Sequence, residues 1–196
     1  MTVAGLLLAA GRSRRFGADK LAALLDGEPI ARRSYRALAA SGVAGPMVVT
    51  GDAAAGAVMF GPQARLVINP APENGLSSSL RLGLAAIGLE AEAIVVALAD
   101  MPLVQAETIA RLAAAIQPGD YAAVPVLDGQ WGNPVALGRE AIADAMQLTG
   151  DRGARGLLSA RQAGVRLVAT QDRGVLHDID TPADLAVTLT GRDAGG

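Results

Sequence analysis

Short, continuous apolar runs recur along the chain, and longer amphipathic segments separate them. The clearest runs cover residues 3–9, 46–50, 66–68, 93–99 and 121–126. A continuous apolar run of this length is typical of a strand that is buried on both faces, as strands are in parallel sheets. The pattern therefore predicts a central sheet whose strands run mostly parallel.

The segments between these runs carry apolar residues at helical spacing, and Pro, Gly or Ser residues mark their ends. We expect helices at residues 29–40, 53–59, 77–87, 105–116, 139–147, 154–162 and 182–189, and further strands at 131–137 and 165–168. Ser77 is expected to cap the third of these helices. Residues 21–27 are expected to be extended, with a turn at Asp26-Gly27.

Strands that alternate with helices predict an α/β fold, here a three-layer, Rossmann-like arrangement with helices on both faces of the sheet. The sequence shows no internal repeat and no low-complexity linker, so residues 1–190 are expected to form a single domain. The Gly-rich end at 191–196 is expected to be a disordered tail. In such sheets ligands bind at the carboxyl ends of the strands, where the strand order reverses.

Composition narrows the classes of function. At 196 residues and 51% hydrophobic content, the chain is large enough for one substantial core. A net charge of −2 gives no basic field for nucleic acid, and the absence of cysteine excludes disulfides and thiolate chemistry. We see neither a signal peptide nor an apolar segment long enough to span a bilayer, so we expect a cytoplasmic protein without a membrane partner.

The first apolar run ends abruptly in a Gly-rich, cationic loop. Within residues 11–20 it holds two glycines, three arginines and Lys20. A buried strand that opens into such a loop is typical of phosphate binding, because the backbone N–H groups come close and the cations add charge. The glycine spacing matches neither the P-loop nor the dinucleotide fingerprint. A solvated surface loop is the alternative.

Two acidic positions farther along the chain suggest a metal site. Asp100 stands where the run 93–99 ends, and Pro102 prevents the strand from continuing in a central position. Asp178 and Asp180 fall on one side of an extended segment. A role as a helix N-cap would explain Asp100, and it would explain one of the two acids Asp178 and Asp180. The alternative is that Asp100 and Asp180 bind Mg²⁺, which is usually held by one or two carboxylates together with substrate phosphates.

Six sequence blocks, in order over nearly the whole chain, resemble the nucleotidyltransferases related to the molybdenum cofactor enzymes. They are residues 8–20 (LAAGRSRRFGADK), 75–80 (GLSSSL), 100–102 (DMP), 132–135 (GNPV), 149–155 (TGDRGAR) and 178–185 (DIDTPADL). The resemblance is greatest to the cytidylyltransferase branch, which joins CMP from CTP to molybdopterin carrying molybdenum. The guanylyltransferase branch typically has Gly where this chain has Ala10, and Asn where it has Asp180.

This resemblance implies a nucleotidyltransferase fold and a role for each matching position. It assigns triphosphate binding to Ala9, Ala10, Gly11, Arg12, Ser13 and Gly17, and the base and ribose to Asn74, Gly75, Ser77 and Ser78. It assigns charge neutralisation and catalysis to Lys20 and Arg15 with Asp100, and Mg²⁺ to Asp100 and Asp180. The second substrate, the acceptor, is assigned to Asn133, Arg152 and Arg155.

Several alternatives remain open from the sequence. Related enzymes with the same fold use GTP as the nucleotide donor, or transfer the nucleotide to other phosphorylated acceptors. A non-catalytic module that carries the molybdenum cofactor to a molybdoenzyme, or to its maturation factor, is a second class, although a carrier needs no metal–triphosphate residues. A dinucleotide-binding redox domain is a third class, and it lacks its glycine fingerprint here. The lone His177 is expected to be structural, and Asp178 either assists the metal or only orders its loop.

Overall fold

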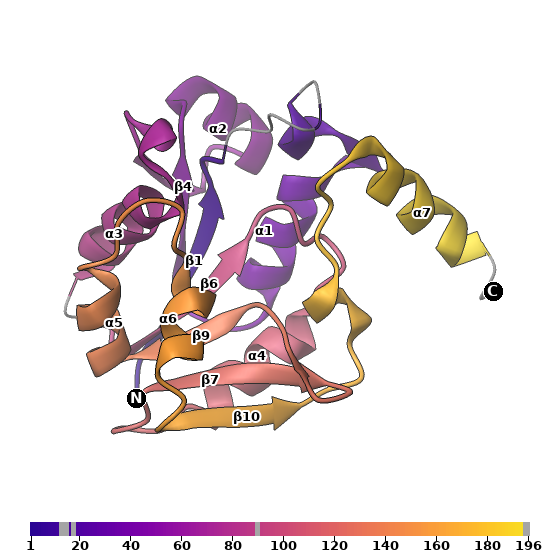
Figure 1. Ribbon diagram of the computed structural model, residues 1–196. Coiled ribbons are helices and arrows are strands. Elements are labelled where there is room, and N and C mark those ends of the chain that lie inside the picture. The colour runs from indigo at the N-terminus through magenta and orange to yellow at the C-terminus, as the bar shows by residue number, and fades with distance from the viewer. Residues whose placement is uncertain (12–15, 17–18, 89–90, 194–196) are drawn as a thin grey trace.

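The structure of the protein is a computed structural model. It describes residues 1–11, 16, 19–88 and 91–193, and after residue 189 it describes the backbone only. Figure 1 shows a central sheet with helices on both faces. Among the described residues, no helix is both long and apolar enough to cross a lipid bilayer.

Eight strands of the described chain form one sheet in the order β10-β7-β9-β6-β1-β4-β5, with β8 paired to β7. The strands are β1 Val3–Ala9, β4 Ala44–Thr50, β5 Arg65–Ile68, β6 Ala93–Leu98, β7 Ala122–Leu127, β8 Gln130–Trp131, β9 Val135–Gly138 and β10 Val165–Ala169. Strand β1 pairs in parallel with β4 and β6, and β4 with β5, whereas β9 is antiparallel to both β6 and β7. The predicted α/β fold with a mostly parallel sheet is confirmed.

The side chains of β1 alternate between two apolar layers, as the period of a strand requires. Leu6 and Leu8 face one layer and Leu7 and Ala9 the other. The first layer packs under α3 Leu76–Ile87, α5 Arg139–Ala145 and α6 Ala154–Ala160, and the second under α1 Ile30–Ala40, α2 Ala53–Phe60 and α4 Ala106–Ala115. The last helix, α7 Pro182–Asp193, extends away from the body (Figure 1).

Helix α3 lies unusually close to the sheet because of Gly83. A Cβ atom at this position would collide with the side chain of Leu6 on β1 and lie 2.9 Å from Val49 on β4. Glycine therefore lets the helix backbone pack directly on β1, which leads into the cationic loop, and on the neighbouring strand β4.

Three local expectations were wrong. Ser77 does not cap α3, because the helix begins at Leu76 with Gly75 as its N-cap at φ +90°. Residues 20–22 form the 3₁₀ turn η1 Lys20–Ala22, in which Asp19 accepts a bond from the N–H of Leu21, and only β2 Leu24–Leu25 and β3 Glu28–Pro29 are extended. The strand expected at 131–137 is two strands, because Pro134 has no N–H to donate to a ladder.

Candidate active site

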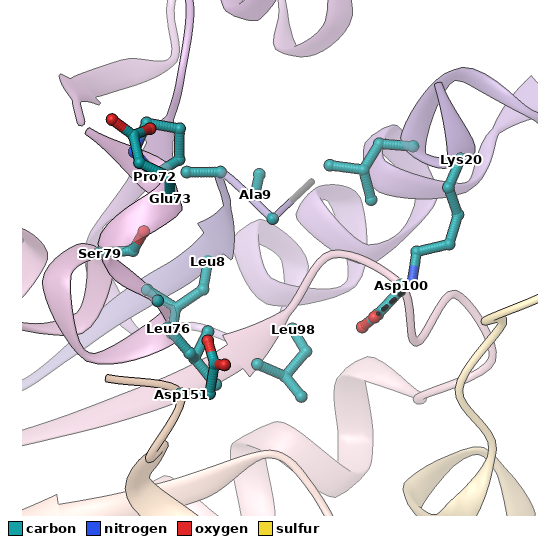
Figure 2. Close-up of a pocket in the computed structure, with 14 residues that line it drawn as sticks. Leu8, Ala9, Lys20, Pro72, Glu73, Leu76, Ser79, Leu98, Asp100 and Asp151 are labelled. Carbon is teal, nitrogen blue, oxygen red and sulfur yellow. Dashed lines mark hydrogen bonds and ion pairs between the residues drawn. The ribbon is translucent and has the colours of Figure 1, made fainter. Parts of the chain in front are cut away.

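A pocket of about 480 Å³ opens at the carboxyl ends of β1 and β6, where the fold predicts a ligand. Figure 2 shows Lys20 and Asp100 on one side of it and Pro72, Glu73 and Ser79 on the other. Ala9, Ala10, Gly11, Leu76 and Asp151 are among the other lining residues. The pocket therefore has one charged side next to the cationic loop and one mixed side under α3.

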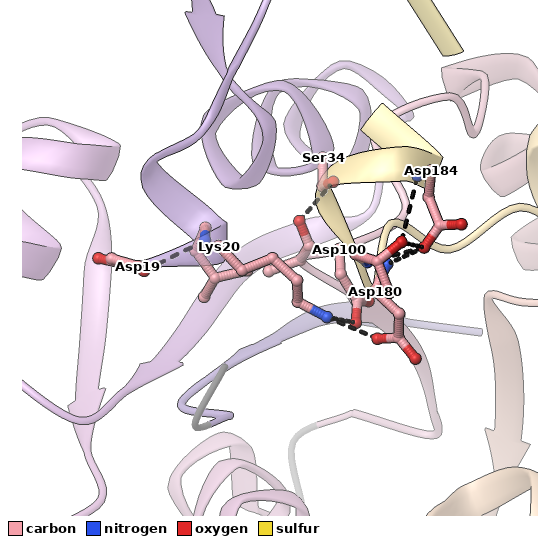
Figure 3. Close-up of polar contacts among 9 residues, drawn as sticks. Asp19, Lys20, Ser34, Asp100, Asp180 and Asp184 are labelled. Atoms are coloured by element: carbon pink, nitrogen blue, oxygen red, sulfur yellow. Dashed lines mark hydrogen bonds and ion pairs between the residues drawn. The ribbon is translucent and has the colours of Figure 1, made fainter. Parts of the chain in front are cut away.

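The charged side is built around Lys20. Its Nζ donates to Asp100 Oδ2 at 2.9 Å and to Asp180 Oδ1 at 2.8 Å (Figure 3). Lys20 is 9% exposed, and the three residues lie 80 and 160 positions apart in the chain. The structure thus brings together the lysine and both aspartates that the sequence assigned to phosphate and metal.

Asp180 is held in place by the backbone on either side of it. The N–H of the fully buried Ile179 donates to the carbonyl oxygen of Asp100 at 2.9 Å, which joins the two acid-bearing segments directly. Asp184 Oδ2 accepts from the N–H groups of Asp180 and Thr181, and Thr181 Oγ1 accepts from the N–H of Asp184. This reciprocal pair closes the first turn of α7 as a capping box.

The N-cap interpretation is therefore wrong for both aspartates. Thr181 and Asp184 cap α7 without the carboxylate of Asp180. The N-cap of α4 is Gln105, whose N–H donates to the buried Asp172, so Asp100 does not cap that helix either. Both carboxylates accept from Lys20 instead, and Asp100 lines the pocket.

Two opposing effects act on the charge of Lys20. Burial by itself lowers the pKa of the ammonium, but its hydrogen bonds and charge interactions with Asp180 and Asp100 outweigh burial and raise the pKa above its ordinary value. Lys20 is therefore protonated throughout the neutral range.

The two carboxylates fit a hard divalent cation. Their oxygens converge on one positively charged nitrogen, so they face a common point, and carboxylate oxygens are the donors that Mg²⁺ and Mn²⁺ prefer. In the described part of the chain, no group of three or more His, Cys, Asp or Glu residues is placed so that it could hold a metal ion. A metal at Asp100 and Asp180 would then take its remaining ligands from substrate and water.

Of the glycine-rich loop 11–20, the structure describes residues 11, 16, 19 and 20. Ala9 and Ala10 are buried at the end of β1, and Gly11 follows at the edge of the pocket. The predicted phosphate ligands Arg12, Ser13, Arg15 and Gly17 lie outside the described residues. Of the tail 191–196 that was expected to be disordered, residues 191–193 continue α7 instead, and residues 194–196 lie outside the described residues.

On the opposite side of the pocket, the structure presents a different set of residues from the predicted one. Gly75 lines the pocket as expected, but Asn74 is not among the lining residues. Ser77 is buried, and the hydroxyl of Ser78 donates to the carbonyl of Gly75. Leu76, Ser79 and Asp151 line the pocket within the sequence blocks 75–80 and 149–155, whereas Glu73 lines it and was not predicted. Helical spacing offered one signal, since Leu76 and Ser79 lie three residues apart on one helix face.

The predicted acceptor residues lie outside the lining of this pocket. Asn133 sits in a turn with a cis bond to Pro134 and donates its N–H to the carbonyl of Val175. Arg155 donates to the carbonyl of Trp131 at 2.7 Å, and Arg152 is exposed beside Asp151. Arg155 therefore joins α6 to β8 in this structure.

Fold and site together define the class of protein. A nucleotidyl transferase from Methanothermobacter thermautotroptrophicus has the same fold, with a TM-score of 0.84 over 100% of this chain and 99% of that one. Rv0371c from Mycobacterium tuberculosis has a TM-score of 0.86 at 26% identity, covering 97% of this chain and 98% of that one. The fold is that of the nucleotidyltransferases.

Within this class, the chain belongs to the MobA-like NTP transferase family, whose domain model matches residues 5–166. The purine catabolism protein PucB of Bacillus subtilis is 34% identical over 92% of each chain. Nicotine blue oxidoreductase of Paenarthrobacter nicotinovorans is 30% identical over 91% of this chain and 92% of that one. Molybdenum cofactor guanylyltransferase of Rhizobium leguminosarum is 33% identical over 65% and 59%. The resemblance found in the sequence is thus confirmed at the level of the family.

Proposed function

We propose that the protein transfers CMP from CTP to the terminal phosphate of molybdopterin, using Mg²⁺ and releasing pyrophosphate. The observation that carries the proposal is the convergence of Lys20, Asp100 and Asp180 at the charged side of the pocket. Membership of the NTP transferase family supports the reaction type. A relative that is a molybdenum cofactor guanylyltransferase supports the acceptor.

The reaction needs little acid–base chemistry. The second pKa of a phosphate monoester is about 6, so the attacking phosphate of the acceptor is already largely a dianion at neutral pH. One of its oxygens attacks the α-phosphorus of CTP, the bond from that phosphorus to the bridging oxygen breaks, and pyrophosphate leaves with the bonding electrons. The difficulty is to bring two anions together in line.

The residues of the pocket suit that task. The backbone at Ala10 and Gly11 reaches the phosphates, and Lys20 neutralises charge that develops on the leaving pyrophosphate. Asp100 and Asp180 would hold Mg²⁺, which neutralises charge on the triphosphate when bound. Rv0371c, of the same fold, has been crystallised in complex with manganese. We assign Arg12, Ser13, Arg15 and Gly17 to the triphosphate as well, and Asn133, Arg152 and Arg155 to the acceptor.

The preference for cytosine rests on the buried end of β1. Ala10 lines the pocket where the guanylyltransferase branch typically has glycine. Asp180 supports the same assignment, since that branch typically has asparagine there. We place the base and ribose on the opposite side, near Gly75, Ser77, Ser78 and Asn74.

Two relatives favour other candidates. The guanylyltransferase relative favours GTP as donor, with the mechanism unchanged. The oxidoreductase relative, similar over most of both chains, favours a redox function. A carrier that delivers the cofactor to a molybdoenzyme without catalysis is a third possibility. These candidates differ in whether pyrophosphate is released and from which triphosphate.

The test is pyrophosphate release with Mg²⁺, molybdopterin and each of the four triphosphates in turn. We expect release with CTP. Release chiefly with GTP would overturn the base assignment and keep the mechanism. Absence of release with any triphosphate, with the cofactor tightly bound, would contradict a transferase acting on this acceptor and favour the carrier.

A further inference from the structure

The ammonium of Lys20 stands at the point where the two carboxylates meet. Figure 3 shows its Nζ between Asp100 and Asp180, bonded to both. The two bonded oxygens cannot lie farther apart than the sum of these short distances. The position that suits a metal is therefore occupied by a cation of the protein itself.

The chain uses lysine at this position alone. Of its 17 Lys and Arg residues, the other 16 are arginines, as the sequence shows. An arginine fork favours one carboxylate, as Arg166 does when it bonds both oxygens of Asp120. An ammonium is a compact charge with three donors, so it can join two separate acids. Among side chains it is the nearest in shape to a metal ion.

Lys20 and a metal compete for the same oxygens. Mg²⁺ lies about 2.1 Å from its oxygen ligands, and the Lys20 nitrogen already lies 2.8–2.9 Å from one oxygen of each carboxylate. Two cations cannot share this space, so Lys20 has to withdraw when a metal enters. A largely buried ammonium that withdraws needs another anion, because an unpaired buried charge is strongly disfavoured.

The triphosphate of a nucleotide is the anion that the pocket supplies. Lys20, Asp100 and Asp180 together carry one net negative charge, and a divalent metal alone would make this group net positive in a partly buried site. A metal that arrives with a triphosphate avoids both problems, because the phosphates neutralise the metal and accept Lys20. Metal and nucleotide binding are then coupled through one side chain.

We infer that Lys20 is a resident cation that occupies Asp100 and Asp180 until a nucleotide arrives, so that the divalent metal binds with the triphosphate and not before it. This inference rests on the proposed function, since it takes a metal–triphosphate complex as the ligand. It adds a second role for Lys20, which excludes free metal as well as contacting phosphate.

The first test measures Mn²⁺ binding without turnover, by electron paramagnetic resonance of the free ion. In the absence of nucleotide, Lys20→Met should bind Mn²⁺ about tenfold or more tightly than the wild type, because a unit charge within about 4 Å no longer repels the metal. With an unreactive CTP analogue carrying an α,β-methylene bridge, Lys20→Met should instead bind Mn²⁺ more weakly than the wild type. Equal Mn²⁺ affinity of the two proteins without nucleotide would overturn the inference.

Two control variants separate charge from its position. Lys20→Arg keeps the charge but favours one carboxylate, so without nucleotide it should bind Mn²⁺ more tightly than the wild type and less tightly than Lys20→Met. Arg166→Met removes one positive charge at the edge strand β10, far along the sheet from the pocket strands. It should leave Mn²⁺ affinity unchanged. An increase in Arg166→Met as large as in Lys20→Met would show a general charge effect and overturn the inference.

The second test uses the wild-type protein, so it does not depend on the folding of a variant. Labelling with ¹⁵Nζ-lysine gives a single side-chain signal, because Lys20 is the only lysine. Millimolar Mg²⁺ alone should leave this signal unchanged, and the analogue together with Mg²⁺ should shift it. The inference would be overturned if Mg²⁺ alone shifted the signal and the shift saturated at the same Mg²⁺ concentration as in the presence of the analogue. Pyrophosphate release from CTP would still support the proposed function in that case.

Discussion

Two clusters in this molecule place one cation between two acids, and they differ in almost everything else. Arg161 bonds Glu140 at 2.6 Å and lies 3.7 Å from Asp144, next to the ring of Tyr121. Its partners are only about 20 residues away in the chain, on α5, and the charged side chains are 43–60% exposed. Lys20 instead joins segments up to 160 residues apart; its side chain is 11% exposed, and those of Asp100 and Asp180 are 25% and 36% exposed.

The contrast separates a structural ion cluster from a candidate catalytic one. Water screens the Arg161 cluster, which fastens the end of α6 to α5 and the sheet. In the Lys20 cluster the ammonium is buried between less exposed acids, and Lys20 and Asp100 line the pocket, where a charge acts strongly on a bound anion. Burial, separation along the chain and position at the strand ends distinguish the functional cluster, whereas the number of ion pairs does not.

The largest effect is expected from removing the buried cation. Lys20→Met keeps most of the side-chain stem and loses the charge that we propose neutralises the leaving pyrophosphate. We expect kcat to fall about 10²-fold or more, as when a single electrostatic donor is lost. Steady-state pyrophosphate release with saturating CTP measures this. Turnover within a few-fold of the wild type would rule out the catalytic role of Lys20.

A second prediction concerns the carboxylate that positions the acid-bearing segments. Asp172 is 5% exposed and accepts from the N–H of Gln105, the hydroxyl of Thr108 and the N–H of Gly174. Asp172→Asn places an NH₂ group against one of these donors. We expect the free energy of unfolding to fall by about 1–3 kcal/mol, which urea denaturation measures. If the free energy of unfolding fell by less than about 0.5 kcal/mol, apolar contacts and not Asp172 would hold residues 172–174 against the start of α4.

A third prediction uses the tyrosine of the exposed cluster. Burial and the hydrogen bond to Asp144 raise the pKa of Tyr121 to about 12, against about 10 in the unfolded chain. The folded state therefore keeps this proton more tightly. Its contribution to stability is complete below about pH 10 and is lost as the pH rises toward about 12. The difference in Tm between the wild type and Tyr121→Phe should shrink between pH 9 and pH 11. A constant difference would contradict the raised pKa.

The smallest effect is expected from the exposed cation itself. Arg161→Gln breaks the bond to Glu140 on a surface where water replaces it readily. We expect Tm to change by no more than about 3 °C and pyrophosphate release to stay at the wild-type level. Loss of activity without loss of stability would show that the exposed cluster, too, serves the reaction.

Much of the fold could be predicted because it depends on features that are local in the sequence. Continuous apolar runs marked the buried strands, and their ends marked the edge where ligands bind. Asp100 and Lys20 were found for the same reason, since each follows the end of a buried strand or its loop. The antiparallel β9 was not predicted as such, because strand direction depends on pairing with β6 and β7, which the pattern does not encode.

The finer arrangement of the site depended on contacts between distant segments. Asp180 was equally suited to a helix cap, and only the capping pair Thr181 and Asp184 leaves its carboxylate to Lys20. The serines of α3 depend on the positive φ of Gly75, which starts the helix one residue early and turns Ser78 back to the backbone. A one-residue shift at a helix start changes which side chains face the pocket.

The central claim is that the buried Lys20 cluster, and not the exposed Arg161 cluster, is the catalytic centre of a nucleotidyltransferase. The most direct measurement is Mg²⁺-dependent pyrophosphate release from CTP and molybdopterin by the wild type, Asp100→Asn and the matched surface variant Asp144→Asn. We predict that Asp100→Asn abolishes release at millimolar Mg²⁺, while Asp144→Asn retains it. Equal release by the two variants would contradict the claim.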